Sequence, residues 1–146
     1  MNEKVILLVE DNPDDAELTR IAFEEAGSSH VIDHVGDGAE ALDYLFGRGR
    51  HAARDGASLP AVVLLDLNLP KLSGREVLQA LRAEPRMRGL PVVVLTTSAE
   101  PFDIDDVYAL GANSYIQKPV EFDRFIEAAR QIGVYWLGLN QAPGGK

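Results

Sequence analysis

Five side chains that can do chemistry follow four separate apolar segments of the sequence, each where the apolar run stops. Glu10 and Asp11 come after KVILLV, Asp66 after AVVLL, Thr96 after PVVVL, and Lys118 after SYIQ. Three carboxylates, a hydroxyl and an ammonium can together bind a cation and a phosphoryl group. Whether they do so depends on the fold bringing these four segments to one place.

The charges of this set indicate which cation it would need. At about 4 Å and an effective dielectric of about 20, each contact between two carboxylates costs about 4 kcal/mol. Lys118 offsets one negative charge, and a hard divalent ion would offset two more. Mg²⁺ fits best, because it keeps several waters and binds through one or two carboxylates together with phosphate oxygens. We therefore expect a Mg²⁺ site.

With that cation in place, the set suits phosphoryl transfer. A carboxylate can form an acyl phosphate, so Asp66 is the candidate nucleophile. Lys118 and the Thr96 hydroxyl would stabilise the negative charge on the equatorial oxygens of the transferred group. The sequence thus predicts a phospho-acceptor at Asp66.

Five apolar segments of strand length alternate with amphipathic stretches of helical period. The predicted strands are residues 4–9, 30–35, 61–65, 91–95 and 114–117. Near-continuous apolar runs are typical of strands buried on both faces. This alternation predicts an α/β fold with a doubly wound, five-stranded parallel sheet, flavodoxin-like order 2-1-3-4-5 and helices on both faces. In such a sheet, ligands bind beyond the carboxyl ends of the strands, where the five side chains above would meet.

The predicted helices have recognisable ends. Asn12 and Pro13 supply an N-cap and a first-turn proline, and Gly111 supplies the C′ position of the fourth helix. The first helix is expected to place Leu18, Ile21, Ala22 and Ala26 toward the core, with Phe23 off to one side. Residues 47–60 form a loop rich in Gly, Arg and Ala that is long for a compact domain.

Composition excludes several classes of function. The formal net charge of −9 argues against an intrinsic nucleic-acid surface, which would be a basic patch. The apolar run at the N-terminus is too short for a signal peptide or a membrane span. The absence of cysteine suits a reducing cytoplasm, where we expect the protein to reside.

Two enzyme classes share part of the pattern. Asp66-Leu67-Asn68 resembles the start of haloacid-dehalogenase-type phosphatases, but those need a second carboxylate where Asn68 stands. The segment GDGAEA, residues 36–41, matches the G-x-G-x-x-A pattern of dinucleotide folds. That pattern belongs after the first strand, where Glu10 and Asp11 would repel a pyrophosphate, so a tight turn before the second helix is the better interpretation. A binding module that works without phosphorylation is a third alternative.

Four segments in order, LLVEDN, LLDLNLP, VVVLTTS and YIQKPV, resemble the signature segments of bacterial two-component receiver domains. The likeness covers nearly the whole chain, from about Lys4 to Leu137. It divides the chain into a receiver domain over residues 1–139 and a disordered tail over 140–146. The long loop, DLNLP, VLTTS and the aromatic end VYWLGL are also similar to single-domain regulators paired with bacterial phytochromes.

The resemblance implies a role for each matching residue. The metal would be held by Asp11, Asp66 and the main-chain carbonyl of Asn68, with Glu10 acting through bound water. Lys118 would contact the phosphoryl group and precede a cis peptide to Pro119. Thr96 and Tyr115 match the switch pair of the family. Asn68 and Ser98 would flank the phosphate and tune how fast water removes it.

The resemblance also implies a partner and an output. A sensor histidine kinase, of the bacteriophytochrome type on the narrower likeness, would phosphorylate Asp66. The protein would catalyse only its own phosphorylation and slow dephosphorylation, so we do not expect a turnover enzyme. A conformational change would alter the surface of the fourth helix, fifth strand and fifth helix.

The end of the last helix carries apolar residues that point in different directions. Phe122, Phe125, Ile126, Ala129, Ile132 and Trp136 share one stripe, while Val134, Tyr135 and Leu139 fall off it. These last three either pack against the domain as an irregular end or form part of a homodimer surface. Together with the fourth helix, fifth strand and fifth helix, they are the predicted self-association surface.

Overall fold

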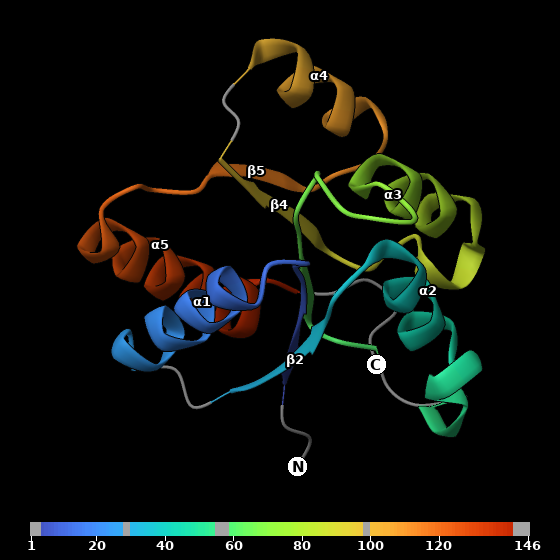
Figure 1. Ribbon diagram of the computed structural model, residues 1–146, viewed down its shortest axis with the longest axis horizontal. Coiled ribbons are helices and arrows are strands. Elements are labelled where there is room, and N and C mark those ends of the chain that lie inside the picture. Colours follow the sequence, from blue (N-terminus) through green and yellow to red (C-terminus); the bar gives the residue numbers. More distant parts are fainter. Residues whose placement is uncertain (1–3, 28–29, 55–58, 98–99, 142–146) are drawn as a thin grey trace.

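A five-stranded parallel sheet with strand order β2-β1-β3-β4-β5 forms the centre of the protein in the computed structural model (Figure 1). The structure describes residues 4–27, 30–54, 59–97 and 100–141. The strands are β1 Val5–Val9, β2 Val31–Val35, β3 Val62–Leu65, β4 Val92–Thr96 and β5 Ser114–Gln117. The predicted fold class and strand order are confirmed, and the predicted strand bounds agree to within one residue.

Helices cover both faces of this sheet (Figure 1). The helices are α1 Pro13–Glu25, α2 Gly38–Phe46, α3 Gly74–Ala83, α4 Pro101–Ala109 and α5 Phe122–Val134. Three shorter elements follow α2, α3 and α5: the 3-10 helices η1 Gly49–Arg54 and η2 Pro85–Met87, and the π-helical turn η3 Tyr135–Leu139. None of the helices in the described ranges is long and apolar enough to cross a membrane.

The sheet separates two apolar cores, because successive side chains of a strand point to opposite faces. Leu7 and Val9 of β1 join the core formed with α2, α3 and Val107 of α4. Ile6 and Leu8 join the core formed with α1 and α5. Burial of the strands on both faces explains why the sequence shows continuous apolar runs instead of alternation.

The buried face of α1 differs from the predicted one. Thr19 and Phe23 are buried with Ala16 and Ala22, whereas Leu18 is 44% exposed. Thr19 can face the core because its hydroxyl donates a hydrogen bond to the Asp15 carbonyl at 2.9 Å, which satisfies its polar atom. The helix begins as predicted, with the Asn12 side chain accepting hydrogen bonds from the amides of residues 14 and 15.

The long loop after α2 is partly helical and docks on α2. The Arg54 guanidinium lies 3.7 Å from the centroid of the Tyr44 ring, and the Tyr44 hydroxyl donates to the Asp33 carboxylate of β2. His51 lies 3.0 Å from the Glu40 carboxylate and meets the edge of the Tyr44 ring. Part of this predicted loop therefore forms η1, which is fixed to α2, and α2 in turn is tied to the edge strand through Tyr44.

Candidate functional site

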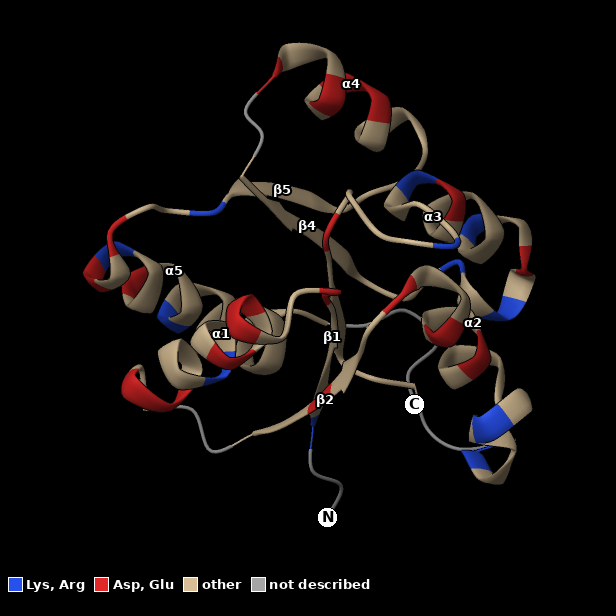
Figure 2. Ribbon diagram, viewed as in Figure 1, with Lys and Arg blue, Asp and Glu red and all other residues tan. Residues whose placement is uncertain are grey.

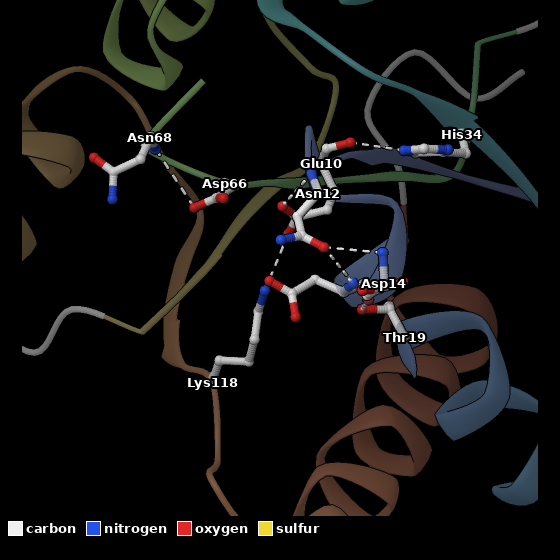
Figure 3. A network of polar contacts seen from close by, with 9 residues as sticks. Glu10, Asn12, Asp14, Thr19, His34, Asp66, Asn68 and Lys118 are labelled. Carbon is white, nitrogen blue, oxygen red and sulfur yellow. Dashed lines mark hydrogen bonds and ion pairs between the residues drawn. The ribbon is translucent and has the colours of Figure 1, made fainter. Parts of the chain in front are cut away.

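The carboxyl ends of β1 and β3 place the three acidic residues side by side. The amide of Asp66 donates to the Val9 carbonyl at 3.2 Å, and the amide of Glu10 donates to the Val35 carbonyl at 3.1 Å, so the ladder of the sheet continues to the site. One carboxylate oxygen from each of Glu10, Asp11 and Asp66 lies within 4.8 Å of the other two. The predicted convergence of these segments is therefore observed (Figure 3).

Glu10 is the buried member of this acidic cluster, with only 2% of its surface exposed. Lys118 Nζ lies 3.0 Å from one of its carboxylate oxygens, and the Asn12 amide donates to the other at 3.2 Å. Burial raises the pKa of Glu10 above its ordinary value; Lys118 and the Asn12 amide oppose this shift, and the nearby Asp66 carboxylate adds to it. Glu10 thus holds the Lys118 ammonium at the site.

The two predicted switch residues lie on neighbouring strands. Thr96 is the last residue of β4 and is buried, and its carbonyl accepts a 2.6 Å hydrogen bond from the Lys118 amide. Tyr115 of β5 stands opposite Val94 and packs, partly buried, against the core on the α2 and α3 side. The hydroxyl of Thr96 and the ammonium of Lys118 therefore come from segments joined by a backbone hydrogen bond.

The loop after β3 begins at Asp66 and is held tightly. The Asn68 amide donates to Asp66 Oδ1 at 3.4 Å, which turns this loop back toward the carboxylate (Figure 3). A turn at Lys71, the one described non-glycine residue with positive φ (68°), is closed by a 2.8 Å hydrogen bond from Leu72 to Pro70. This kind of backbone strain is typical of functional loops.

Glycines 38 and 74 fix the position of that loop. A Cβ atom on Gly38, at the start of α2, would lie 2.2 Å from the Leu72 carbonyl oxygen. A Cβ atom on Gly74, at the start of α3, would lie 2.5 Å from the Asp66 carbonyl oxygen. Of the glycines in residues 36–41, Gly38 therefore serves a close contact between α2 and the loop, whereas a Cβ atom on Gly36 would meet nothing within 4 Å.

Sequence reasoning missed several residues that shape the site. Ser73 and Glu76 form a reciprocal capping box that starts α3 beside Asp66. Their Ser-x-x-Glu spacing was a readable signal. His34 Nε2 lies 2.7 Å from the Glu10 carbonyl oxygen, and no sequence motif predicts this contact.

Two expectations for the site have other outcomes. No cis peptide bond occurs in the described ranges, so the Lys118–Pro119 peptide is trans and the expectation of a cis bond is wrong. Ser98 lies outside the described residues, as do residues 142–146 of the predicted tail. The remaining expected members of the site are described residues, and all of them except Tyr115, which lies within β5, are at the carboxyl edge of the sheet.

The donor set fits a hard divalent cation. Three carboxylates offer oxygens within a few ångströms of one another, and one cationic side chain, Lys118, pairs with the most buried of them. Without further positive charge, the other two carboxylates would repel each other. Oxygen donors of this kind are the ligands of Mg²⁺ and of similar ions such as Mn²⁺.

Comparison with known proteins identifies the class of protein. Residues 6–130 match the family model described as the response regulator receiver domain, so the chain belongs to that family. With the family established, the haloacid-dehalogenase-type phosphatase is no longer a viable alternative.

Its relatives narrow this class. The chain is 46% identical over 140 residues to a probable methanogenesis regulatory protein, FilR2, of Methanothrix harundinacea, covering 96% of this chain and 88% of that protein. It is 40% identical to the phosphorylated cyanobacterial phytochrome response regulator RcpA, with a TM-score of 0.87 over 98% of this chain and 100% of that one. Response regulator Rcp1, known from Synechocystis sp., has a Mn²⁺-bound structure that is 35% identical with a TM-score of 0.84, covering 97% of this chain and 99% of that one. Phytochrome response regulators are thus among its close homologues.

Proposed function

We propose that this receiver domain accepts a phosphoryl group on Asp66 from the phosphohistidine of a sensor histidine kinase. The observation that carries the proposal is the acidic cluster of Glu10, Asp11 and Asp66 with the Lys118 ammonium held against Glu10. A carboxylate that accepts a phosphoryl group needs positive charge around it. Lys118 supplies one cation here, and the carboxylate oxygens of the cluster can bind a metal cation as the second. An Asp66 Oδ–P bond forms as the P–N bond to the kinase imidazole breaks, and the imidazole keeps the electron pair.

A divalent cation, Mg²⁺ in our proposal, would be held by Asp11, Asp66 and the main-chain carbonyl of Asn68, with Glu10 acting through water. When bound, it neutralises negative charge on the carboxylates and on the phosphoryl oxygens. The fit of the donor set and the Mn²⁺-bound form of Rcp1 support a divalent ion here.

Lys118 and Thr96 contact the phosphoryl group in this proposal. Lys118 supplies a charge to one phosphoryl oxygen, and the Thr96 hydroxyl moves toward another. The Tyr115 ring then turns into the space that Thr96 leaves, which alters the surface of α4, β5 and α5. Asn68 and Ser98 tune the slow attack of water, and the protein catalyses no other reaction.

The partner proposed is a cytoplasmic sensor histidine kinase of the phytochrome type. Similarity to RcpA and Rcp1 supports this pairing, whereas the similarity to FilR2 leaves a kinase with another stimulus as the alternative. These two kinds of kinase can be distinguished by measuring phosphoryl transfer to Asp66. One assay uses a bacteriophytochrome kinase as donor, and the other uses a kinase that lacks a chromophore domain.

We also propose a homodimer through α4, β5, α5 and the C-terminal end. Val134, Tyr135 and Leu139 are exposed, which supports the interpretation that their apolar surfaces are available to another chain. Exposed apolar groups gathered at one end of a helix favour burial against another chain. The Tyr135 ring lies edge-on to Trp136, with centroids 4.9 Å apart, which anchors it at this surface.

Transfer of ³²P from a phosphorylated histidine kinase tests the acceptor. The wild type should gain label in the presence of Mg²⁺, and Asp66→Asn should gain none. Asp33→Asn, which changes a carboxylate outside the site, should be labelled like the wild type. Label on the Asp66→Asn protein would refute the proposed acceptor.

A further inference from the structure

Helix α4 has little apolar attachment to the rest of the protein. Val107 is its one buried side chain in the described structure, while Phe102 is 74% exposed and Tyr108 is also exposed. Its first turn has no side-chain cap. In Figure 1, α4 lies on the outer side of the β4 and β5 end of the sheet. A helix held this weakly by burial needs other contacts to fix its position.

One arginine of α3 supplies such contacts. The Arg75 guanidinium donates to the carboxylates of both Asp103 and Asp106, which are three residues apart and so share one face of α4. A planar guanidinium can hold two carboxylates at once, which an ammonium cannot do with the same geometry. Figure 2 shows acidic positions on α4 and basic positions on α3 beside it.

A second arginine of α3 fixes the other end of α4. Arg82 lies seven residues after Arg75, so both occupy one face of α3. It donates to the Gly111 carbonyl at 3.0 Å and to the Asn113 side chain at 2.9 Å. Gly111 has φ of 107°, and a Cβ atom there would lie 2.7 Å from Arg82 Cγ. Arg82 thus holds the turn after α4 against α3. At this turn Gly111 has a backbone conformation that allows rotation of α4 about it.

The two helices are tied to different parts of the phosphorylation site. Gly74 presses α3 against the Asp66 carbonyl oxygen and donates from its amide to the Leu67 carbonyl at 3.1 Å. Helix α4 instead follows β4, which ends at Thr96. The Arg75 bridge therefore joins a helix fixed beside Asp66 to a helix that follows the strand carrying Thr96.

We propose that Arg75 is a latch that holds α4 in its resting position and opens when Asp66 is phosphorylated. This inference rests on the proposed function, since it needs Thr96 to move toward the phosphoryl group. Helix α3 stays with Asp66, α4 is drawn along with Thr96 and turns about Gly111, and Arg75 loses Asp103 and Asp106. Release of the latch changes how α4 presents Phe102 and Tyr108 to a partner.

Amide hydrogen exchange of α4 tests the latch in the unphosphorylated protein. Arg75→Met keeps the apolar stem and removes the charge, and exchange of the α4 amides should become about tenfold faster. The double substitution Asp103→Asn with Asp106→Asn removes the α4 partners of Arg75 and should speed exchange of the α4 amides to the same extent. Arg124→Met is the matched control, because its pair with Glu121 is exposed and lies outside α4. Unchanged α4 exchange in both latch variants would overturn the proposal.

Binding of a phosphate mimic tests the coupling. Because coupling free energy is reciprocal, a protein without the latch should bind beryllofluoride with Mg²⁺ about fivefold more tightly than the wild type. Arg75→Lys keeps the positive charge but loses the planar group that reaches both carboxylates. Its affinity for beryllofluoride should lie between those of the wild type and Arg75→Met. Equal affinity of the wild type and Arg75→Met would refute the latch while leaving the proposed function intact. Failure of the wild type itself to bind the mimic would refute the proposed function.

Discussion

Replacing Lys118 by methionine should lower the free energy of unfolding and yet raise the affinity of the protein for its divalent cation. The Lys118 and Glu10 side chains are only 12% and 3% exposed, and their charged atoms are 3.0 Å apart. Breaking a buried pair by removing one partner costs about 3–5 kcal/mol. Because this pair lies at the open edge of the sheet, we expect the lower end, about 3 kcal/mol in the free energy of unfolding at pH 7.

The same substitution removes a positive charge next to the metal site. Two charges on a cation and one on Lys118, about 6 Å apart in a water-like dielectric of about 80, repel by about 1.4 kcal/mol. The affinity for Mg²⁺ should therefore rise by about tenfold, while phosphoryl transfer to Asp66 falls. Isothermal titration with Mg²⁺ measures the first effect, and labelling by a phosphorylated kinase measures the second.

The stability deficit of Lys118→Met should depend on pH. Burial already raises the pKa of Glu10, and loss of Lys118 raises it further. A group with a raised pKa contributes most to stability when protonated, below its unfolded value of about 4.5, and loses that contribution as pH rises through its folded pKa. Urea denaturation should therefore show a larger deficit at pH 8 than at pH 5.

Lys71→Met is the matched control for this experiment. Lys71 likewise follows a strand at this edge of the sheet, in the loop after β3, but it is exposed and pairs with Asp37 at 3.4 Å instead of with Glu10. It should change stability by less than about 1 kcal/mol. A Lys118→Met protein that unfolds like this control and binds Mg²⁺ no more tightly than the wild type would contradict the reasoning.

Two further predictions concern packing and association. Gly74→Ala should destabilise the protein by about 1–3 kcal/mol in urea denaturation, because its Cβ would overlap the Asp66 carbonyl oxygen; Gly133→Ala, with open space around the new Cβ, should be neutral or slightly stabilising. Light scattering should give a dimer mass for the wild type. Replacing the exposed Val134, Tyr135 and Leu139 by serine should give a monomer mass. A mass that these substitutions leave unchanged would refute the proposed dimer.

The sequence was sufficient for the sheet and for the grouping of the site residues. The central strands β1, β3 and β4 are almost entirely apolar, and Glu10, Asp66, Thr96 and Lys118 each stand where a strand ends or just after it. In a parallel sheet those ends share one edge, so strand order and convergence follow from pattern and topology.

Features that depend on tertiary contacts were not predictable in this way. Thr19 is buried with its hydroxyl bonded within its own helix, whereas its residue type suggests a surface position, and Leu18, expected in the core, is 44% exposed. The docking of η1 depends on Tyr44 reaching Asp33 and Arg54, which come from different elements. The closeness of Gly38 to Leu72 likewise joins segments whose distance no local pattern encodes.

The division of the interior by the sheet has a consequence for how a change on one side spreads. The apolar cluster beneath α2, α3 and α4 and the one beneath α1 and α5 have no side chain in common. Helix α4 can therefore change its position without repacking the side chains under α5. A substitution that repacks one of these clusters should therefore leave the side-chain packing of the other unchanged.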